Sequence, residues 1–237
     1  MNDQADKLKL RAETAFVTDR DPAFLKPPAK APTGDFDQAR HIPSVKLQIL
    51  PDLVPEYFGE GEQYMACWAN WAYVTRAEGD RFFCAASDHL GRGATLNVYE
   101  YAAREGTLTR ILDVGRLLGW SADSYTDGKI HGHMGVTPDG LLWGVTHEGV
   151  HPTPAWHAAG FRGSWLFSYD LKTREARNWG VPFPGHSLPC STLDEKRGRY
   201  VVATSSGAIL TWDCNDKRVR HAGYPPNGWT WWARSLF

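Results

Sequence analysis

Residues 198–223 read GRYVVATSSGAILTWDCNDKRVRHAG and contain three short runs rich in β-branched and aromatic residues. The runs GRYVVATSSG, ILTWD and KRVRHAG are separated by residues that favour turns. Runs of this length and composition predict antiparallel strands. The run HSLPCSTLD directly before them supplies another strand, so the segment predicts a sheet of four antiparallel strands.

The same pattern occurs twice more upstream. One earlier set consists of DRFFCAASDHLG, LNVYEY and TLTRILDV, and another of GLLWGVTHEG, WLFSYD and REARNWGV. The runs YMACWANWAYVT and KIHGHMGVT precede these sets as first strands, and GWTWWARSLF is the beginning of a fourth set. A repeated unit of four antiparallel strands is typical of β-propeller blades, and an insertion in the second unit makes the first interval longer than the next. The segment GRLLGW, between two units, predicts one short helical turn.

Residues 60–237 resemble the bacterial propeller proteins of the WD40/YVTN-like superfamily. The resemblance is carried by DGKIHGHMGVTPDGLLWGVTHEG, LFSYDLKTREARNWGVPFPG and LDEKRGRYVVATSSGAILTWD. It implies an all-β chain of four-stranded antiparallel blades, about three and a half of them within residues 45–237. Residues 1–44 are rich in Pro, Asp, Lys and Ala, and this composition predicts an extended arm or linker. Because this number of blades cannot close a ring, we expect either a fragment of a longer propeller or self-association that completes the ring.

The composition argues against several classes of function. The formal net charge is −1 and the sequence has no basic stripe, so we expect neither nucleic acid nor a membrane surface as a partner. The sequence shows no signal peptide, which predicts a cytoplasmic protein, or a secreted or periplasmic one if the chain is a fragment. The spacing of the four cysteines matches no zinc or disulfide framework and predicts free thiols.

Residues 129–151, KIHGHMGVTPDGLLWGVTHEGVH, contain four of the nine histidines. The sequence TPDGL predicts a tight turn in which Thr137 pairs with Leu141. The same register places His131 opposite His147, and strand alternation puts His131 and His133 on one face. Three imidazoles are therefore predicted to converge at one mouth of the propeller channel.

Seven histidines are predicted at this mouth: His89, His131, His133, His147, His151, His157 and His186. Neutral imidazole is a common ligand of transition metals, and three such ligands can leave positions open for a substrate. We therefore expect a divalent metal, Mn or Zn, at His131, His133 and His147, with His89 or His186 as the next ligand. The competing interpretation is a polar channel lining in which these imidazoles bind backbone carbonyls or water.

The predicted site resembles that of metal-dependent oligogalacturonate lyases, which are propellers with a histidine-rich metal site that includes a His-x-His pair. The resemblance implies an enzyme acting on uronate-containing oligosaccharides, with His131 and His133 as the pair. A metal that neutralises the uronate carboxylate would acidify the neighbouring C5 proton for removal by a base. Tyr125 and His186 are candidate bases, Arg92, Arg162 and Lys129 candidate carboxylate-binding residues, and Trp120 and Trp156 candidate aromatic walls.

Two other functions stay open. A non-catalytic propeller that binds a glycan or a protein on the same face predicts saturable binding without a metal or turnover. A calcium-dependent lactonase or hydrolase fits less well, because calcium prefers oxygen ligands. Several further side chains are predicted to be structural: Trp143, Trp165, Trp179 and Trp212 as core between blades, and Glu100, Asp170 and Asp213 at blade corners.

Overall fold

The computed structural model describes residues 16–19, 22, 45–48, 50, 70–88, 91–121, 124–149, 154–158 and 160–225. The chain divides into two compact units, Met1–Pro51 and Asp52–Phe237. In the first unit, strand β1 (Phe16–Asp19) pairs antiparallel with β2 (Val45–Gln48). The segment Val45–Gln48, placed at the start of the blades by the sequence, thus pairs within the first unit. Most of the predicted arm lies outside the described residues.

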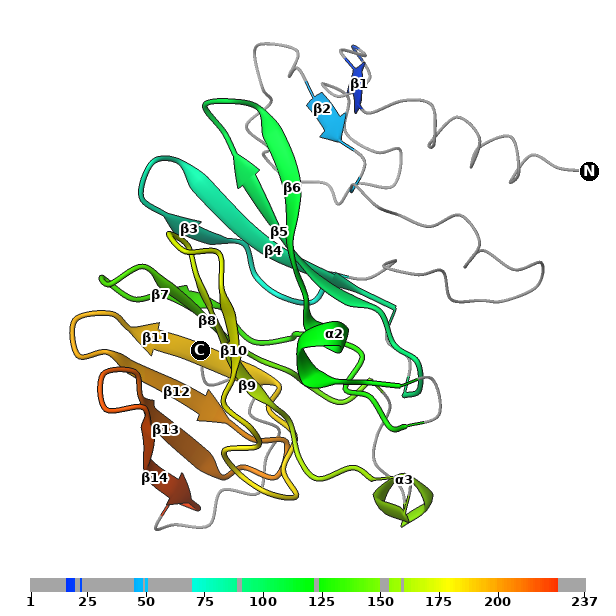
Figure 1. Cartoon of the computed structure of the whole chain (residues 1–237), viewed down its shortest axis with the longest axis vertical. Coiled ribbons are helices and arrows are strands. Elements are labelled where there is room, and N and C mark those ends of the chain that lie inside the picture. The colour runs from blue at the N-terminus through cyan, green and yellow to red at the C-terminus, as the bar shows by residue number, and fades with distance from the viewer. Residues whose placement is uncertain are drawn as a thin grey trace, which may run out of the picture. The chain divides into compact units, whose positions relative to one another are not determined.

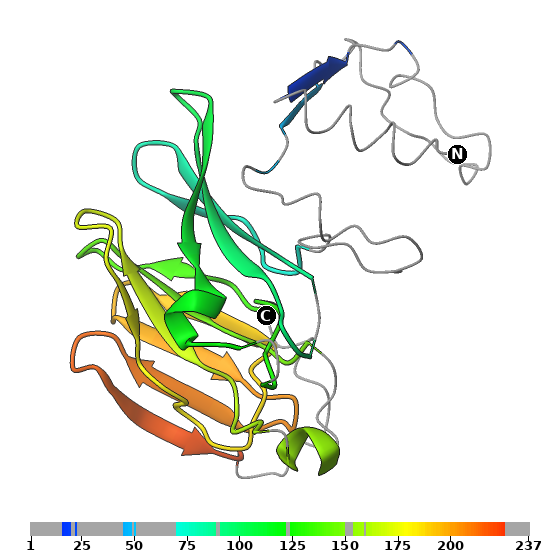
Figure 2. The same cartoon turned by 45° about the vertical axis from the view of Figure 1, so that its right-hand side comes forward.

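The second unit contains three four-stranded antiparallel sheets, each formed by four consecutive strands. Figures 1 and 2 show them fanned side by side in chain order. Blade 1 comprises β3 (Thr75–Ala77), β4 (Arg81–Ser87), β5 (Leu96–Ala102) and β6 (Thr107–Asp113). Blade 2 comprises β7 (Gly135–Val136), β8 (Leu141–Val145), β9 (Leu166–Asp170) and β10 (Ala176–Asn178). Blade 3 comprises β11 (Cys190–Asp194), β12 (Arg199–Ala203), β13 (Ile209–Asp213) and β14 (Arg218–Gly223).

This arrangement confirms the prediction of an all-β, incomplete propeller of about three blades. The predicted start of a fourth blade, GWTWWARSLF, lies outside the described residues. Within the described residues the helices are short: α2 (Val114–Leu118) and α3 (Pro154–Ala158). In the part of the chain that the structure describes, no helix is both long and apolar enough to cross a membrane.

Helix α2 is the short helical turn predicted from GRLLGW. The Asp113 carboxylate accepts a hydrogen bond from the Arg116 backbone N–H at 2.9 Å, which satisfies one of the donors left open at a helix start. The helix ends at Gly119, whose φ of +69° is a left-handed conformation that glycine adopts without steric cost. Local residue chemistry therefore determines both ends of this helix.

Strand alternation separates the residues of blade 2 into two cores. Leu142 and Phe167 pack with blade 1, whereas Trp143 and Leu166 pack with blade 3. All four side chains are completely buried. Each contributes on the order of 1.5–3 kcal/mol by leaving water, so both faces of the central blade stabilise the assembly.

The tryptophans predicted as core are confirmed in that role. Trp143 and Trp212 belong to the core between blades 2 and 3, Trp179 packs against the same core, and Trp165 packs against the other. The Lys217 ammonium lies 4.7 Å from the Trp143 ring centroid and adds a cation–π contact at the edge of this cluster.

Two of the acids predicted at blade corners hold the turns that follow them. The Asp170 carboxylate accepts hydrogen bonds from the backbone N–H groups of Lys172 and Thr173, and Asp213 accepts from Asn215 and Asp216. Glu100 instead forms an ion pair with Arg81 on the neighbouring strand. These carboxylates are structural. Cys84, Cys190 and Cys214 are free thiols, as predicted, and Cys67 lies outside the described residues.

Candidate functional site

The first strands of the three blades meet where the propeller axis would lie, and β7 contacts both β3 and β11. The Thr75 hydroxyl of blade 1 donates to the Met134 carbonyl of blade 2 at 2.7 Å. On the other side, the Ser191 hydroxyl of blade 3 donates to the His133 carbonyl at 2.8 Å, and the Tyr200 hydroxyl reaches the same carbonyl at 2.5 Å. The His-Gly-His segment is therefore bonded to both neighbouring blades.

Gly132 permits the close approach between blades 2 and 3. A Cβ atom at this position would lie 2.1 Å from the Ser191 hydroxyl oxygen and 2.7 Å from the Ser191 backbone nitrogen. Any larger residue would push the two segments apart. The glycine between the two histidines thus has a packing role that the His-x-His pattern alone did not indicate.

The two histidines of the pair stack on aromatic rings from the segment that leads into β3. The rings of Trp71 and His131 are 5.6 Å apart and inclined by 15°, and those of Tyr73 and His133 are 3.9 Å apart and inclined by 8°. Trp71 and Tyr73 keep 41% and 59% of their surface exposed. Beside them is a cavity of about 150 Å³, here called the channel hollow, lined by Tyr73, His131, Gly132, His133, Pro189, Cys190 and Ser191.

The hairpin register agrees with the prediction near its turn and departs from it near the mouth. Gly135 pairs with Trp143, and the Thr137 backbone N–H bonds to the Leu141 carbonyl, as expected. Farther along, however, Lys129 rather than His131 lies opposite His147. The register shifts because the intervening segment bonds to blades 1 and 3 instead of β8. The His131 and His147 rings still meet edge to face, with centroids 5.4 Å apart.

Both of these rings have polar partners from blade 3. His131 Nδ1 lies 3.1 Å from the Pro189 carbonyl oxygen. His147 Nδ1 lies 2.6 Å from the Ser187 hydroxyl and 3.0 Å from Glu148 Oε2. Serine and carboxylate therefore contact the same ring nitrogen, whereas a catalytic triad places them on opposite nitrogens. The contacts orient His147 and do not activate Ser187.

A buried charged cluster lies behind His147. Asp127, Lys129 and Glu148 are each at most 6% exposed. Burial raises the pKa of Asp127 to about 7, although hydrogen bonds with Thr146 and Ser164 act to lower it. Charged groups are seldom buried without partners. The sequence analysis did not identify Glu148 and Ser187 as site residues, because neither stands in a recognisable motif. For Glu148, its position directly after His147 was the signal that could have identified it.

The two candidate bases, Tyr125 and His186, lie in different surroundings, and the Tyr125 ring meets Phe161 edge to face with centroids 5.0 Å apart. Burial and the nearby charges of Asp127 and Glu148 raise the pKa of Tyr125 above its ordinary value, which keeps the phenol protonated. His186 lies in the segment before β11, where its Nδ1 is 2.9 Å from the Ser206 hydroxyl and its ring contacts Phe183. Burial lowers the pKa of His186.

The other predicted residues are dispersed. Lys129 lies at the site, with its ammonium 5.9 Å from the Trp71 ring centroid. Trp120 packs against the core between blades 1 and 2, and Arg92 and Arg162 are exposed. His157, on α3, contacts Phe161 with ring centroids 5.3 Å apart. His89, His151 and the Trp156 side chain lie outside the described residues.

The predicted three-histidine metal site is not assembled within the described part of the chain. No group of three or more histidine, cysteine, aspartate or glutamate side chains is arranged there to hold a metal ion. The rings of His131 and His147 contact each other, whereas the His133 ring stacks on Tyr73. Because His89 lies outside the described residues, the metal stays a prediction.

No protein-family model and no curated protein matches this chain. Among solved structures, a chain in a crystal structure of the mitotic checkpoint complex is 13% identical, with a TM-score of 0.43, over 71% of this chain and 44% of that one. An auxiliary nutrient binding protein from Bacteroides thetaiotaomicron VPI-5482 is 14% identical, with a TM-score of 0.40, over 63% and 30%. This chain spans less than half the length of either. The propeller fold rests on the sheet topology described above, and the specific superfamily stays a prediction.

Proposed function

We propose that the channel hollow binds one sugar ring of an oligosaccharide. The observation that carries this proposal is the pair of ring stacks, Trp71 on His131 and Tyr73 on His133, beside a cavity with exposed aromatic surface. Aromatic faces bind the apolar faces of sugar rings, while hydroxyl and imidazole groups bind their polar edges. The hollow holds both kinds of group within a few residues.

The size of the hollow favours a single ring over a larger ligand. Sites for drug-sized molecules usually enclose about 300–1,000 Å³, and the hollow has about 150 Å³. The remaining sugars of a chain would extend past the exposed edges of Trp71 and Tyr73. Binding at this place requires no turnover, which corresponds to the non-catalytic function left open by the sequence.

Isothermal titration with galacturonate oligomers and with neutral oligomers of the same length tests this proposal. We expect saturable binding in the wild type that weakens at least tenfold in Tyr73→Ala, because the stacking face is lost. The matched control is Tyr224→Ala, since Tyr224 is similarly exposed at 55% but lies in blade 3 beside His186. Absence of saturable heat with every oligomer, or an equal loss in both variants, would contradict the proposal.

A metal-dependent uronate lyase is the second candidate function. It is favoured by the contact between the His131 and His147 rings and by the position of Lys129, the one predicted carboxylate-binding residue at this cluster. A metal would need another ligand beyond the two imidazoles, and His89 is the predicted source.

Elemental analysis of purified protein, together with the ultraviolet absorbance of unsaturated uronate products, tests this second candidate. The lyase predicts about one transition-metal equivalent per chain, lost in His131→Ala and in His147→Ala, and product formation that ceases with it. His157→Ala is the control, because His157 is exposed on α3. A metal-free wild-type protein that forms no product would eliminate the lyase and leave the binding function intact.

A further inference from the structure

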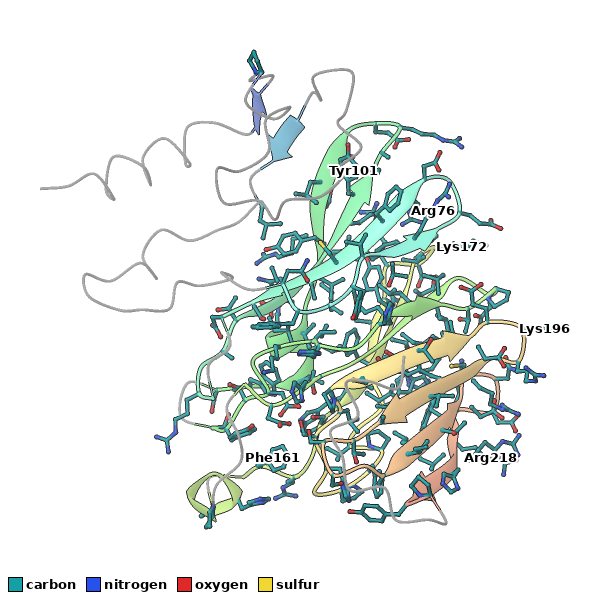
Figure 3. The ribbon with its side chains drawn as sticks, turned by 180° about the vertical axis from the view of Figure 1, so that it is seen from behind. Arg76, Tyr101, Phe161, Lys172, Lys196 and Arg218 are labelled. Atoms are coloured by element: carbon teal, nitrogen blue, oxygen red, sulfur yellow. The ribbon has the colours of Figure 1, made fainter. Side chains whose placement is uncertain are left out.

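A second and larger cavity lies at the other end of the first strands. It has a volume of about 660 Å³ and is formed by the turns between β3 and β4, β7 and β8, and β9 and β10, with Glu195 from blade 3. Figure 3 labels Arg76 and Lys172 at this end and Phe161 at the opposite end. We call this cavity the interblade groove. Its volume falls in the range of about 300–1,000 Å³ that is usual for ligand sites.

The groove differs chemically from the channel hollow. Its lining includes the apolar side chains of Val136 and Leu171 but no aromatic residue, so it offers no stacking face for a sugar. Arg76, Arg81 and Lys172 bring positive charge from blades 1 and 2, and Arg81 is already paired with Glu100. Glu78 and Glu195 bring negative charge from blades 1 and 3. A ligand carrying one sign of charge would therefore meet repulsion along part of the lining.

The charged groups are available to a ligand. Arg76 pairs with Asp80, but their side chains are 69% and 36% exposed, and such exposed pairs contribute only about 0.2–1 kcal/mol. Lys172 and Glu195 are exposed, and within the described residues neither has an ion-pair partner. An incoming carboxylate can bind Arg76 and Lys172, and an incoming cation can bind Glu195, at little cost to the fold.

We propose that the interblade groove binds an extended peptide segment of a partner protein, one that carries an acidic side chain, a basic side chain and an apolar side chain between them. The acidic side chain binds Arg76 and Lys172, the basic one binds Glu195, and the apolar one packs on Val136 and Leu171. A peptide satisfies all three requirements at once, whereas a saccharide or a simple anion satisfies one. This site is separate from the proposed sugar site.

Selection of phage-displayed random heptapeptides against the full chain, followed by fluorescence anisotropy of a labelled selected peptide, tests the proposal. We expect selected sequences with both charge signs, and binding that weakens at least tenfold in Lys172→Glu and in Glu195→Lys. Lys196→Glu is the matched control, because Lys196 is an exposed neighbour of Glu195 that does not line the groove. Replacing the acidic residue of the peptide by lysine should restore binding to Lys172→Glu.

Three results would overturn the proposal. The selection could return no binding peptide, or peptides of a single charge sign. The anisotropy could be insensitive to both groove variants, or equally sensitive to Lys196→Glu. Finally, binding could be abolished by Tyr73→Ala and unaffected by the groove variants, which would place the peptide in the channel hollow. Sugar titrations of the groove variants separate this outcome from a failure of the sugar site, because those variants should bind sugars like the wild type.

Discussion

At the scale of single residues, the buried carboxyl group of Asp127 makes the stability of this molecule depend on pH. It is 2% exposed, its side chain accepts a hydrogen bond from Thr146, and Lys129 and Glu148 are the charged groups that interact with it. Burial raises its pKa to about 7 in the folded protein, whereas an unfolded aspartate titrates near pH 3.9. Between these two pKa values the folded protein therefore keeps the Asp127 carboxyl group protonated, whereas the unfolded chain releases the proton.

The stability contributed by Asp127 is fully present below about pH 4 and is lost as the pH rises through about 7. We expect the free energy of unfolding to fall with pH across this interval, by up to about 4 kcal/mol from this group. Asp127→Asn should flatten the slope, since an amide stays neutral. Urea unfolding between pH 4.5 and 8 measures how the free energy of unfolding depends on pH. Asp139→Asn, at an exposed turn position, should keep the wild-type slope; an unchanged slope in Asp127→Asn would contradict the assignment.

Tyr200 is a second residue whose role can be isolated, because its hydroxyl binds the carbonyl of His133 from the neighbouring blade. In Tyr200→Phe the ring packing is retained, and the contacts of the hydroxyl with the His133 carbonyl and with the Ser191 hydroxyl are both lost. We expect a loss of about 1 kcal/mol in the free energy of unfolding, kept small because Ser191 still donates to the same carbonyl. Tyr224→Phe, at an exposed position, should change stability by less than about 0.5 kcal/mol. Equal effects of the two variants in chemical denaturation would refute a special role for Tyr200.

At the scale of elements, the close approach of β7 and β11 determines where the histidines lie. The segment before β7 gives up its pairing with β8 and bonds to blades 1 and 3 instead. Gly132 allows this exchange because a side chain there would overlap Ser191. The contact between two blades, rather than the hairpin itself, therefore aims His131 and His133.

Gly132→Ala should destabilise the protein by about 1–3 kcal/mol, because overpacking forces the two segments apart. The matched control is Gly223→Ala, where the nearest atoms, from His221, would lie 3.8 Å from the new Cβ. That variant should stay within about 0.5 kcal/mol of the wild type. Thermal or urea unfolding of both proteins gives the comparison. Equal stability of Gly132→Ala and the wild type would show that the segments can separate freely.

At the scale of the whole molecule, blade 1 and blade 3 each pack against a single neighbour among the described sheets, which is blade 2. Three blades cannot form the closed ring that protects sheet faces in a propeller. The sequence left two interpretations open, a fragment of a longer propeller and self-association that completes the ring, and the second predicts that copies of this chain associate through the end blades. Light scattering coupled to size exclusion should give a mass of at least two chains that decreases on dilution. A single-chain mass at every concentration would argue against self-association.

Much of this molecule follows from local sequence. The continuous apolar run LLWGV predicts a strand buried on both faces, and Leu142 and Trp143 indeed enter different cores. The acids after the third strands predict turns, and Asp170 and Asp213 hold them. The four-strand repeat predicts the blades. Each of these features depends on residues that are close in the chain. Because hydrogen bonds between such residues allow few other backbone conformations, local sequence is enough to predict them.

The candidate site depended on contacts between blades, which no short pattern encodes. The hairpin register near the turn was predictable, but the shift that places Lys129 opposite His147 is caused by hydrogen bonds from Ser191 and Thr75. The partners of His131 and His147, the stacking of Trp71 and Tyr73, and the burial of Asp127 likewise come from segments distant in sequence. The sequence by itself thus determined the strands, turns and blade order, because these are local. Only the tertiary structure decided which side chains meet, because blade-to-blade packing competes with strand pairing and here prevails.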